Sequence, residues 1–444
     1  MRKCPPLFGL DMPLSRTIEV TNDRNAASYS QGIPQEGVGV PVLLLALYTA
    51  FEFGRPSNTL HLPMVISAVL FLVWIIQPHK KWNVQINCFL IFLAVMVIDI
   101  PLAANNYKAF WSTYGMVVML LCFVIPLIHV VDSLRKLALL INTWIVVFVY
   151  VGVWAIFHEG FGPAGTDGHD ENFVGAMMTM ALPFAFFSIS LKTGLVRKTL
   201  LGLFCVVYLL AIVVGMSRGA FVGLCLVLPF CLKYSQKKWA GWMIGFGLVM
   251  ALSLFATESY WNEMATITDT EESTAGARIE LWKIATSMFL HYPITGVGPG
   301  NYVWRLQEFA SDSQYEKYGG TLGVVAAHSL YFTLIAELGL AGAILFLVVL
   351  YQNYKDVKLI GQVINRARKR LELGMIILPE GQKASYAEDL ERAYCLRNAL
   401  AASLIGCLAT SAFISTLYNS NFWVLTAMIV ALREICLSKW RTEA

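Results

Sequence analysis

The chain has 444 residues, of which 57% are hydrophobic and 14% are charged, whereas soluble domains average roughly 45–50% apolar and about 25% charged residues. This composition excludes an ordinary soluble enzyme. The formal net charge of +4 does not indicate a nucleic-acid partner, because the basic residues form short clusters between apolar runs. The nine cysteines lack paired metal-ligand spacing, so we expect neither disulfides nor zinc.

Residues 1–37 are polar and contain four prolines. They lack the short apolar core and small-residue cleavage site of a signal peptide. We therefore expect a flexible cytoplasmic tail.

Apolar runs of about 20 residues, the length that crosses a hydrocarbon layer about 30 Å thick, recur along the rest of the chain. They predict an all-α polytopic membrane protein with about twelve transmembrane helices. Nine helices fall within 38–256 and three within 328–438, with a large outer loop, 257–327, before the tenth. The predicted spans are 38–54, 60–77, 86–104, 113–131, 137–157, 173–191, 199–215, 218–233, 239–256, 328–351, 397–417 and 421–438.

The boundary between the seventh and eighth spans lies at Gly215-Met216-Ser217-Arg218. One continuous helix there would exceed about 30 residues and would hold Arg218 in lipid at a cost of several kcal/mol. We therefore predict a tight turn at a membrane face.

Counting basic residues orients the spans. With twelve spans both termini share a face, and the segments on that face carry 26 of the 33 Lys and Arg residues, against 7 on the other. By the positive-inside rule the termini, including 439–444, are cytoplasmic. The loop 352–396 is then also cytoplasmic, and its basic run at 365–370 either attracts anionic lipid head groups or is ordinary inside charge.

Three outward-facing basic residues stand where apolar residues would be expected. Arg218 lies among small neighbours, and its side chain either snorkels to a lipid phosphate or binds an anion. Arg278 opens an amphipathic stretch, 276–290, whose apolar positions recur at helical spacing and predict a helix on the outer face. His328 precedes the tenth span, where an imidazole acts either as a general base or as a hydrogen-bonded interfacial residue.

Two further outer segments carry candidate residues. Asp170-Glu171-Asn172 ends a glycine-containing loop, where Asp170 either contacts sugar hydroxyls or caps the sixth span. The segment 291–302 holds three glycines and two prolines. It is either a structural turn or a place where backbone N–H groups approach an oxyanion.

Taken in order, these motifs resemble those of the O-antigen ligase superfamily. The resemblance covers roughly residues 40–438 and rests on the motifs' order and membrane side. The motifs that carry it are Asp170-Glu171-Asn172, Ser217-Arg218-Gly219, Gly276-Ala277-Arg278, Gly296-Val297-Gly298-Pro299-Gly300-Asn301 and Ala327-His328-Ser329. Asp-Glu-Asn departs from the Asp-Pro-Asn of many relatives, which leaves the role of that loop open.

The resemblance implies a glycosyltransferase of the bacterial inner membrane. Such a protein moves a glycan from undecaprenyl diphosphate to a hydroxyl acceptor at the periplasmic face, with no cofactor and no required metal. By similarity, Arg218 and Arg278 bind the diphosphate and His328 deprotonates the acceptor for inverting attack. The supporting residues are Ser217, Asp170, Asn172, Gly298, Gly300, Tyr302 and Ser329.

The partners that the resemblance implies are the lipid-linked glycan donor, membrane lipids, and lipid A-core or another glycan as acceptor. Members of this superfamily with the same arrangement of spans catalyse three reactions: ligation of O-antigen to lipid A-core, polymerisation of repeat units, and glycosylation of a protein. We favour ligation. A flippase or transporter is the alternative from another class. Such proteins usually show two matching halves, and we find no such repeat in this sequence.

Overall fold

The structure, a computed structural model, describes residues 39–54, 62–78, 80–163, 170–235, 273–312, 325–376 and 378–440, together with isolated positions between 241 and 314. The predicted tail 1–37 and most of the predicted ninth span, 239–256, lie outside these residues. So do 257–272 and 315–324 of the predicted outer loop, apart from two single positions, and the last four residues.

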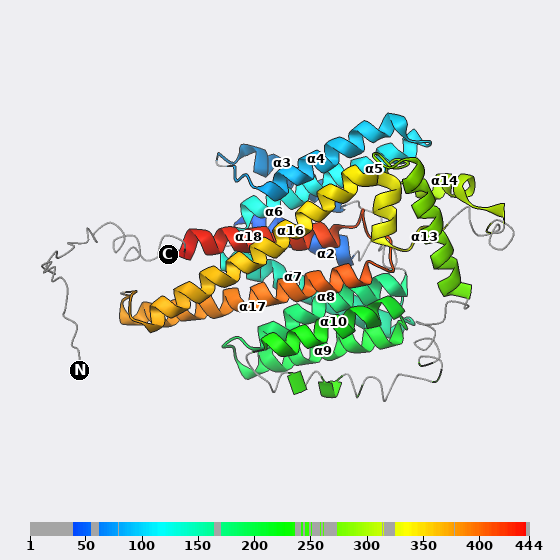
Figure 1. Ribbon diagram of the computed structural model, residues 1–444. Coiled ribbons are helices and arrows are strands. Elements are labelled where there is room, and N and C mark those ends of the chain that lie inside the picture. The colour runs from blue at the N-terminus through cyan, green and yellow to red at the C-terminus, as the bar shows by residue number, and fades with distance from the viewer. Residues whose placement is uncertain are drawn as a thin grey trace, which may run out of the picture. The chain divides into compact units, whose positions relative to one another are not determined.

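All regular structure in the described segments is helical (Figure 1). A 3-10 turn, Ile100–Leu102, extends α4, and a π-helical turn, Leu120–Val124, joins α5 to α6. The helices are α2 (Val40–Gly54), α3 (Leu62–Ile76), α4 (Val84–Asp99), α5 (Asn106–Met119), α6 (Ile125–Val130), α7 (Leu134–Phe157), α8 (Glu171–Ile189), α9 (Leu195–Val214), α10 (Arg218–Tyr234), α13 (Ser273–His291), α14 (Tyr302–Phe309), α16 (Leu330–Glu372), α17 (Glu380–Thr410) and α18 (Ser420–Trp440).

Eight helical segments of the described chain are long and apolar enough to cross a membrane. They are α4 with its turn, α5 to α6, α7, α8, α9, α16, α17 and α18. The apolar helices α2 and α3 are shorter, and α10 has 17 residues. The prediction of an all-α, multi-pass membrane protein is confirmed, whereas the count of twelve stays a prediction.

The local predictions have different outcomes. The tight turn is confirmed, since α9 ends at Val214 and α10 begins at Arg218. The predicted loop 352–396 needs correction: α16 continues to Glu372 and α17 begins at Glu380, so most of this segment is a helical hairpin. Its residues favour this outcome, because good helix formers dominate 362–372 and 382–396, whereas Gly374 and Pro379 lie between the two helices.

Helix α8 lies at the centre of a group with α9, α10 and α17 (Figure 1). Every α8 residue from Phe173 to Ile189 is buried. Small residues allow the close approach: a Cβ on Gly175 would lie 2.7 Å from Ala220 Cβ, and one on Gly223 would lie 2.6 Å from Thr410 Cγ2. Small residues serve helix packing in membranes in this way, and here they bring the first turns of α8 and α10 together.

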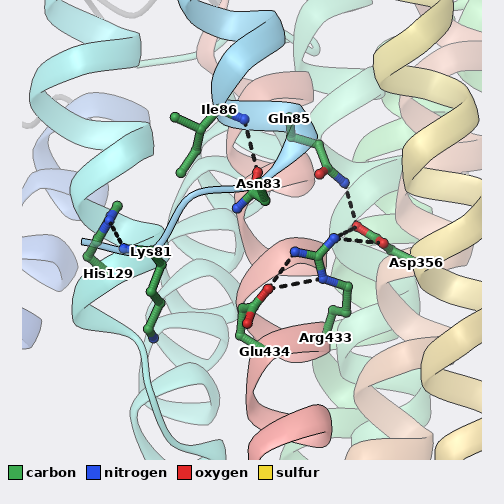
Figure 2. A network of polar contacts seen from close by, with 8 residues as sticks. All are labelled: Lys81, Asn83, Gln85, Ile86, His129, Asp356, Arg433 and Glu434. Atoms are coloured by element: carbon green, nitrogen blue, oxygen red, sulfur yellow. Dashed lines mark hydrogen bonds and ion pairs between the residues drawn. The ribbon is translucent and has the colours of Figure 1, made fainter. Parts of the chain in front are cut away.

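A polar cluster ties α4, α16 and α18 together away from that end (Figure 2). The Arg433 guanidinium donates to both carboxylate oxygens of Asp356, at 3.0 and 3.2 Å, and the Gln85 amide donates to the same carboxylate. The side chains of Arg433 and Asp356 are 14% and 5% exposed. A buried charge without its partner is costly. A shift of one helix along the others would separate these partners, so this cluster fixes the register of the three helices.

Candidate functional site

Loops that connect the helices gather at one end of the described structure. The Asn105 N–H donates to Asn301 Oδ1 at 2.8 Å, and the Leu330 N–H donates to the Ser411 carbonyl at 2.8 Å. A Cβ on Gly160 would lie 2.4 Å from Gly215 Cα, so these two loops touch. The loops that meet here are those that the positive-inside count assigns to the outer face.

A cavity of about 560 Å³ opens among these loops. Four residues proposed from the sequence line it together: Asp170, Asn172, Arg278 and His328. They come from the start of α8, from α13 and from the segment before α16. The remaining lining residues are Phe161, Glu171, Ala277, Leu281 and Val325.

Asp170 is both a helix cap and a wall of the cavity. Its Oδ1 accepts from the backbone N–H of Asn172 at 2.8 Å, so Asp170 caps the N-terminus of α8. This is one of the two roles that the sequence predicted for it. It also accepts from the Asn172 side-chain amide at 2.8 Å. The Ser217 hydroxyl in turn donates to Asn172 Oδ1 at 2.9 Å, so the motifs at 170–172 and 217–219 form one hydrogen-bonded unit.

Arg218 lies beside that unit but does not line the cavity. It is the first residue of α10, directly after Ser217, and is 9% exposed. The structure therefore brings Arg278 and His328 to one cavity. It places Arg218 next to Ser217, which is hydrogen-bonded to the lining residue Asn172.

His328 has an unusual backbone conformation, with φ 46°. The flanking residues hold it in place: the Ala327 carbonyl accepts from Trp282 Nε1 at 2.9 Å, and Ser329 is buried with its carbonyl accepting from Thr333 Oγ1 at 2.7 Å. Among described non-glycine residues, positive φ occurs also at Glu159 and Met216, both in loops beside this cavity. Such conformations cluster at functional sites.

The imidazole of His328 is held toward its neutral form. Burial lowers its pKa from the ordinary value, the positive charge of Arg278 lowers the pKa further, and the negative charge of Asp170 opposes them. A neutral imidazole at neutral pH can accept a proton from a hydroxyl group.

Helix α13 presents Arg278 from a well-packed support. The apolar positions that predicted an amphipathic helix are all buried: Leu281, Ile284, Ala285 and Met288. The buried Tyr302 hydroxyl donates to the Leu281 carbonyl at 2.8 Å, which joins α14 to α13 one turn beyond Arg278. A helix is present where one was predicted and these apolar positions are buried, whereas its place on the outer face of the membrane stays a prediction.

The glycine segment serves packing, and the N–H groups of its three glycines are already paired. Val297 and Gly298 donate to the carbonyls of Ala336 and Glu337 at 2.8 and 3.0 Å, and Gly300 donates to the Glu337 carboxylate at 2.7 Å. The oxyanion interpretation is therefore wrong for these groups, and the structural turn is the correct one. A Cβ would lie 2.5 Å from Ala103 Cβ at Gly298 and 2.2 Å from Ser112 Oγ at Gly300.

Sequence reasoning missed Glu337, the residue that organises this turn. Its carboxylate accepts from the N–H groups of Gly300 and Tyr302 and from the Tyr418 hydroxyl, and the side chain is buried. Next to it α16 is broken at Gly339, with φ 55°. The available signal was a carboxylate within an apolar span, because such a group requires partners.

The cavity thus combines a cation, a neutral base and two carboxylates with an apolar side. Within this set Arg278 can contact an anionic leaving group, and His328 can accept the proton of a hydroxyl nucleophile. In the described part of the chain, no group of three His, Cys, Asp or Glu residues has metal-site geometry.

Part of the chain matches a known protein family. Residues 203–347 match the family model described as O-antigen ligase. This segment contains Ser217, Arg218, Arg278 and His328, together with the glycine turn at residues 296–300. Asp170 and Asn172 precede the matched segment. No curated protein matches the chain.

Proposed function

From the match of residues 203–347 to the O-antigen ligase family model, we propose that the chain is a member of the O-antigen ligase/polymerase superfamily and transfers a glycan from undecaprenyl diphosphate to a hydroxyl acceptor at the periplasmic face of the bacterial inner membrane. The observation that carries the proposal is the shared cavity of His328, Arg278, Asp170 and Asn172. The family supports a ligase- or polymerase-type glycosyltransferase, and the donor, acceptor and mechanism are our proposal.

In the proposed reaction the acceptor hydroxyl loses its proton to the neutral His328 imidazole. The acceptor oxygen forms a bond to the anomeric carbon while the bond from that carbon to the diphosphate oxygen breaks, with inversion. The electron pair leaves with the diphosphate. Neither a metal nor a cofactor takes part.

Arg278 stabilises the departing diphosphate. A guanidinium is always charged and presents a planar fork of donors to phosphate oxygens. Arg218 is assigned to the same diphosphate by family similarity, and it follows Ser217, whose hydroxyl donates to the cavity residue Asn172. The apolar lining, Phe161, Leu281 and Val325, suits the lipid side of the donor.

Ligation to lipid A-core is the favoured reaction, ahead of polymerisation of repeat units and of protein glycosylation. A lipid-linked glycan transporter is the alternative from another class. The imidazole and the arginine share one cavity, where proton transfer from a hydroxyl can occur next to an anionic leaving group, and this favours chemistry over transport.

The test is transfer by the purified protein, in EDTA, of a glycan from undecaprenyl diphosphate to two rival acceptors: lipid A-core and a second carrier-linked repeat unit. Product on lipid A-core supports the ligase, and product only on the second carrier makes the protein a polymerase. Loss of product in EDTA contradicts the metal-independent mechanism. Absence of product with either acceptor, together with movement of the donor across a vesicle membrane, contradicts the proposed function.

A further inference from the structure

A second cavity, of about 460 Å³, lies next to the segment that carries His328. Val325 and His328 line the first cavity, whereas Ala326 and Ala327 line the second. One short non-helical stretch of chain therefore separates the two cavities. The chemistry proposed above makes no use of the second one.

The walls of the second cavity are held rigidly. Glu337, Gly300, Tyr302 and Tyr418 all line it, and the Glu337 carboxylate accepts hydrogen bonds from the other three. These residues belong to α16, the glycine turn, α14 and the segment after α17. A cavity whose walls are already fixed loses little conformational entropy when a ligand binds.

The lining of the second cavity differs chemically from that of the first. It presents hydroxyl and amide groups of Ser112, Ser415 and Asn419, with one cation, Lys108, and one carboxylate, Glu337. The two charges balance, and the hydroxyl and amide groups both donate and accept hydrogen bonds. This lining fits an uncharged, polyhydroxylated ligand better than a phosphate.

Trp111 supplies a flat apolar surface at the same cavity. Its side chain lines the cavity and is 48% exposed. It belongs to an aromatic group on α5 with Tyr107, Phe110 and Tyr114, with ring centroids 5.4 to 6.1 Å from its own. Exposed rings at the end of a membrane helix often form an interfacial belt, but Phe110, 49% exposed, does not line the cavity whereas Trp111 does.

We propose that the second cavity binds a sugar ring of the acceptor glycan, packed on the Trp111 indole and hydrogen-bonded to Asn419 and Ser112. The apolar face of a pyranose packs on an aromatic ring while its hydroxyl groups meet the polar wall. The assignment to the acceptor rests on the proposed function, since the acceptor is the substrate whose hydroxyl must reach His328. Trp111 and Asn419 are then specificity-determining residues.

The test measures binding and transfer separately. The probe is a fluorescently labelled oligosaccharide released from the lipopolysaccharide core of the bacterium that encodes the protein. It is titrated into the full-length protein in detergent without donor. Wild type binds it saturably. Trp111→Ala and Asn419→Ala each raise the Kd about tenfold or more, and the matched control Phe110→Ala binds like wild type. In transfer assays Trp111→Ala raises the KM for the acceptor and leaves the KM for the donor unchanged.

Several results would overturn the inference: no saturable binding by wild type, unchanged binding by both variants, or equal weakening by Phe110→Ala, which would identify a lipid-facing belt. A rise in the donor KM alone would assign the cavity to the donor glycan and would also contradict it. Thermal stability of each variant, measured in detergent, separates lost binding from misfolding. His328→Ala binds the oligosaccharide like wild type even if it fails to transfer, so failure of the proposed chemistry is distinguishable from failure of this binding site.

Discussion

His328 carries the catalytic argument at the scale of a single residue. Its neighbours act on its pKa in opposite directions: Arg278 lowers it and Asp170 raises it, on top of the lowering by burial. A base must be unprotonated, so transfer falls as the pH drops through this pKa and holds a plateau above it. With the pKa lowered, the fall lies below the ordinary histidine range, about 6.5.

Two charge-removing variants should move that fall in opposite directions. Arg278→Gln removes a positive charge and raises the pKa of His328, so the acid limb of kcat/KM moves to higher pH. Asp170→Asn removes a negative charge, and the limb moves to lower pH. The position of the limb, and not the height of the plateau, is the quantity to compare. Limbs that coincide with wild type in both variants would remove His328 as the titrating base.

At the scale of an element, the packing of the glycine turn 296–300 can be tested by comparing Gly298 with Gly374, which follows α16. Gly298 and Gly374 both have positive φ, 98° and 68°, but a Cβ on Gly298 would collide with Ala103 whereas Gly374 has open space around it. Gly298→Ala therefore adds a steric clash to a backbone strain of about 1–3 kcal/mol, and Gly374→Ala adds strain alone. Melting temperatures in detergent should fall further for Gly298→Ala. Equal falls would show that the turn does not pack as described.

Sequence reasoning was strong for elements and weak for the contacts between them. Apolar periodicity gave α13 and its buried face, and Gly215 with Arg218 gave the break between α9 and α10, because each depends on local physics. The meeting of Arg278 with His328 was expected only from family resemblance, since periodicity carries no information on which loops touch. Glu337 and Tyr418 pair across separate segments, and a single sequence does not encode that pairing in any local pattern.

Membrane sidedness is the prediction at the scale of the whole molecule. Leu290 on α13 and Met375 between α16 and α17 are exposed apolar residues, 70% and 65%, that the positive-inside count assigns to opposite faces. In a background with Cys4→Ser and Cys225→Ser, a membrane-impermeant maleimide should label Leu290→Cys in intact spheroplasts and Met375→Cys only after permeabilisation. The reverse pattern would place the cavity on the cytoplasmic face.

The central claim is that the cavity around His328 performs glycosyl transfer, and the most direct measurement is single-turnover transfer by purified His328→Ala. Loss of a general base typically costs about 10²–10⁴-fold in rate, and we expect a loss of that size with unchanged melting temperature. His291→Ala is the matched control, because His291 lies on α13 outside the cavity, and it should transfer like wild type. Undiminished transfer by His328→Ala would contradict the account.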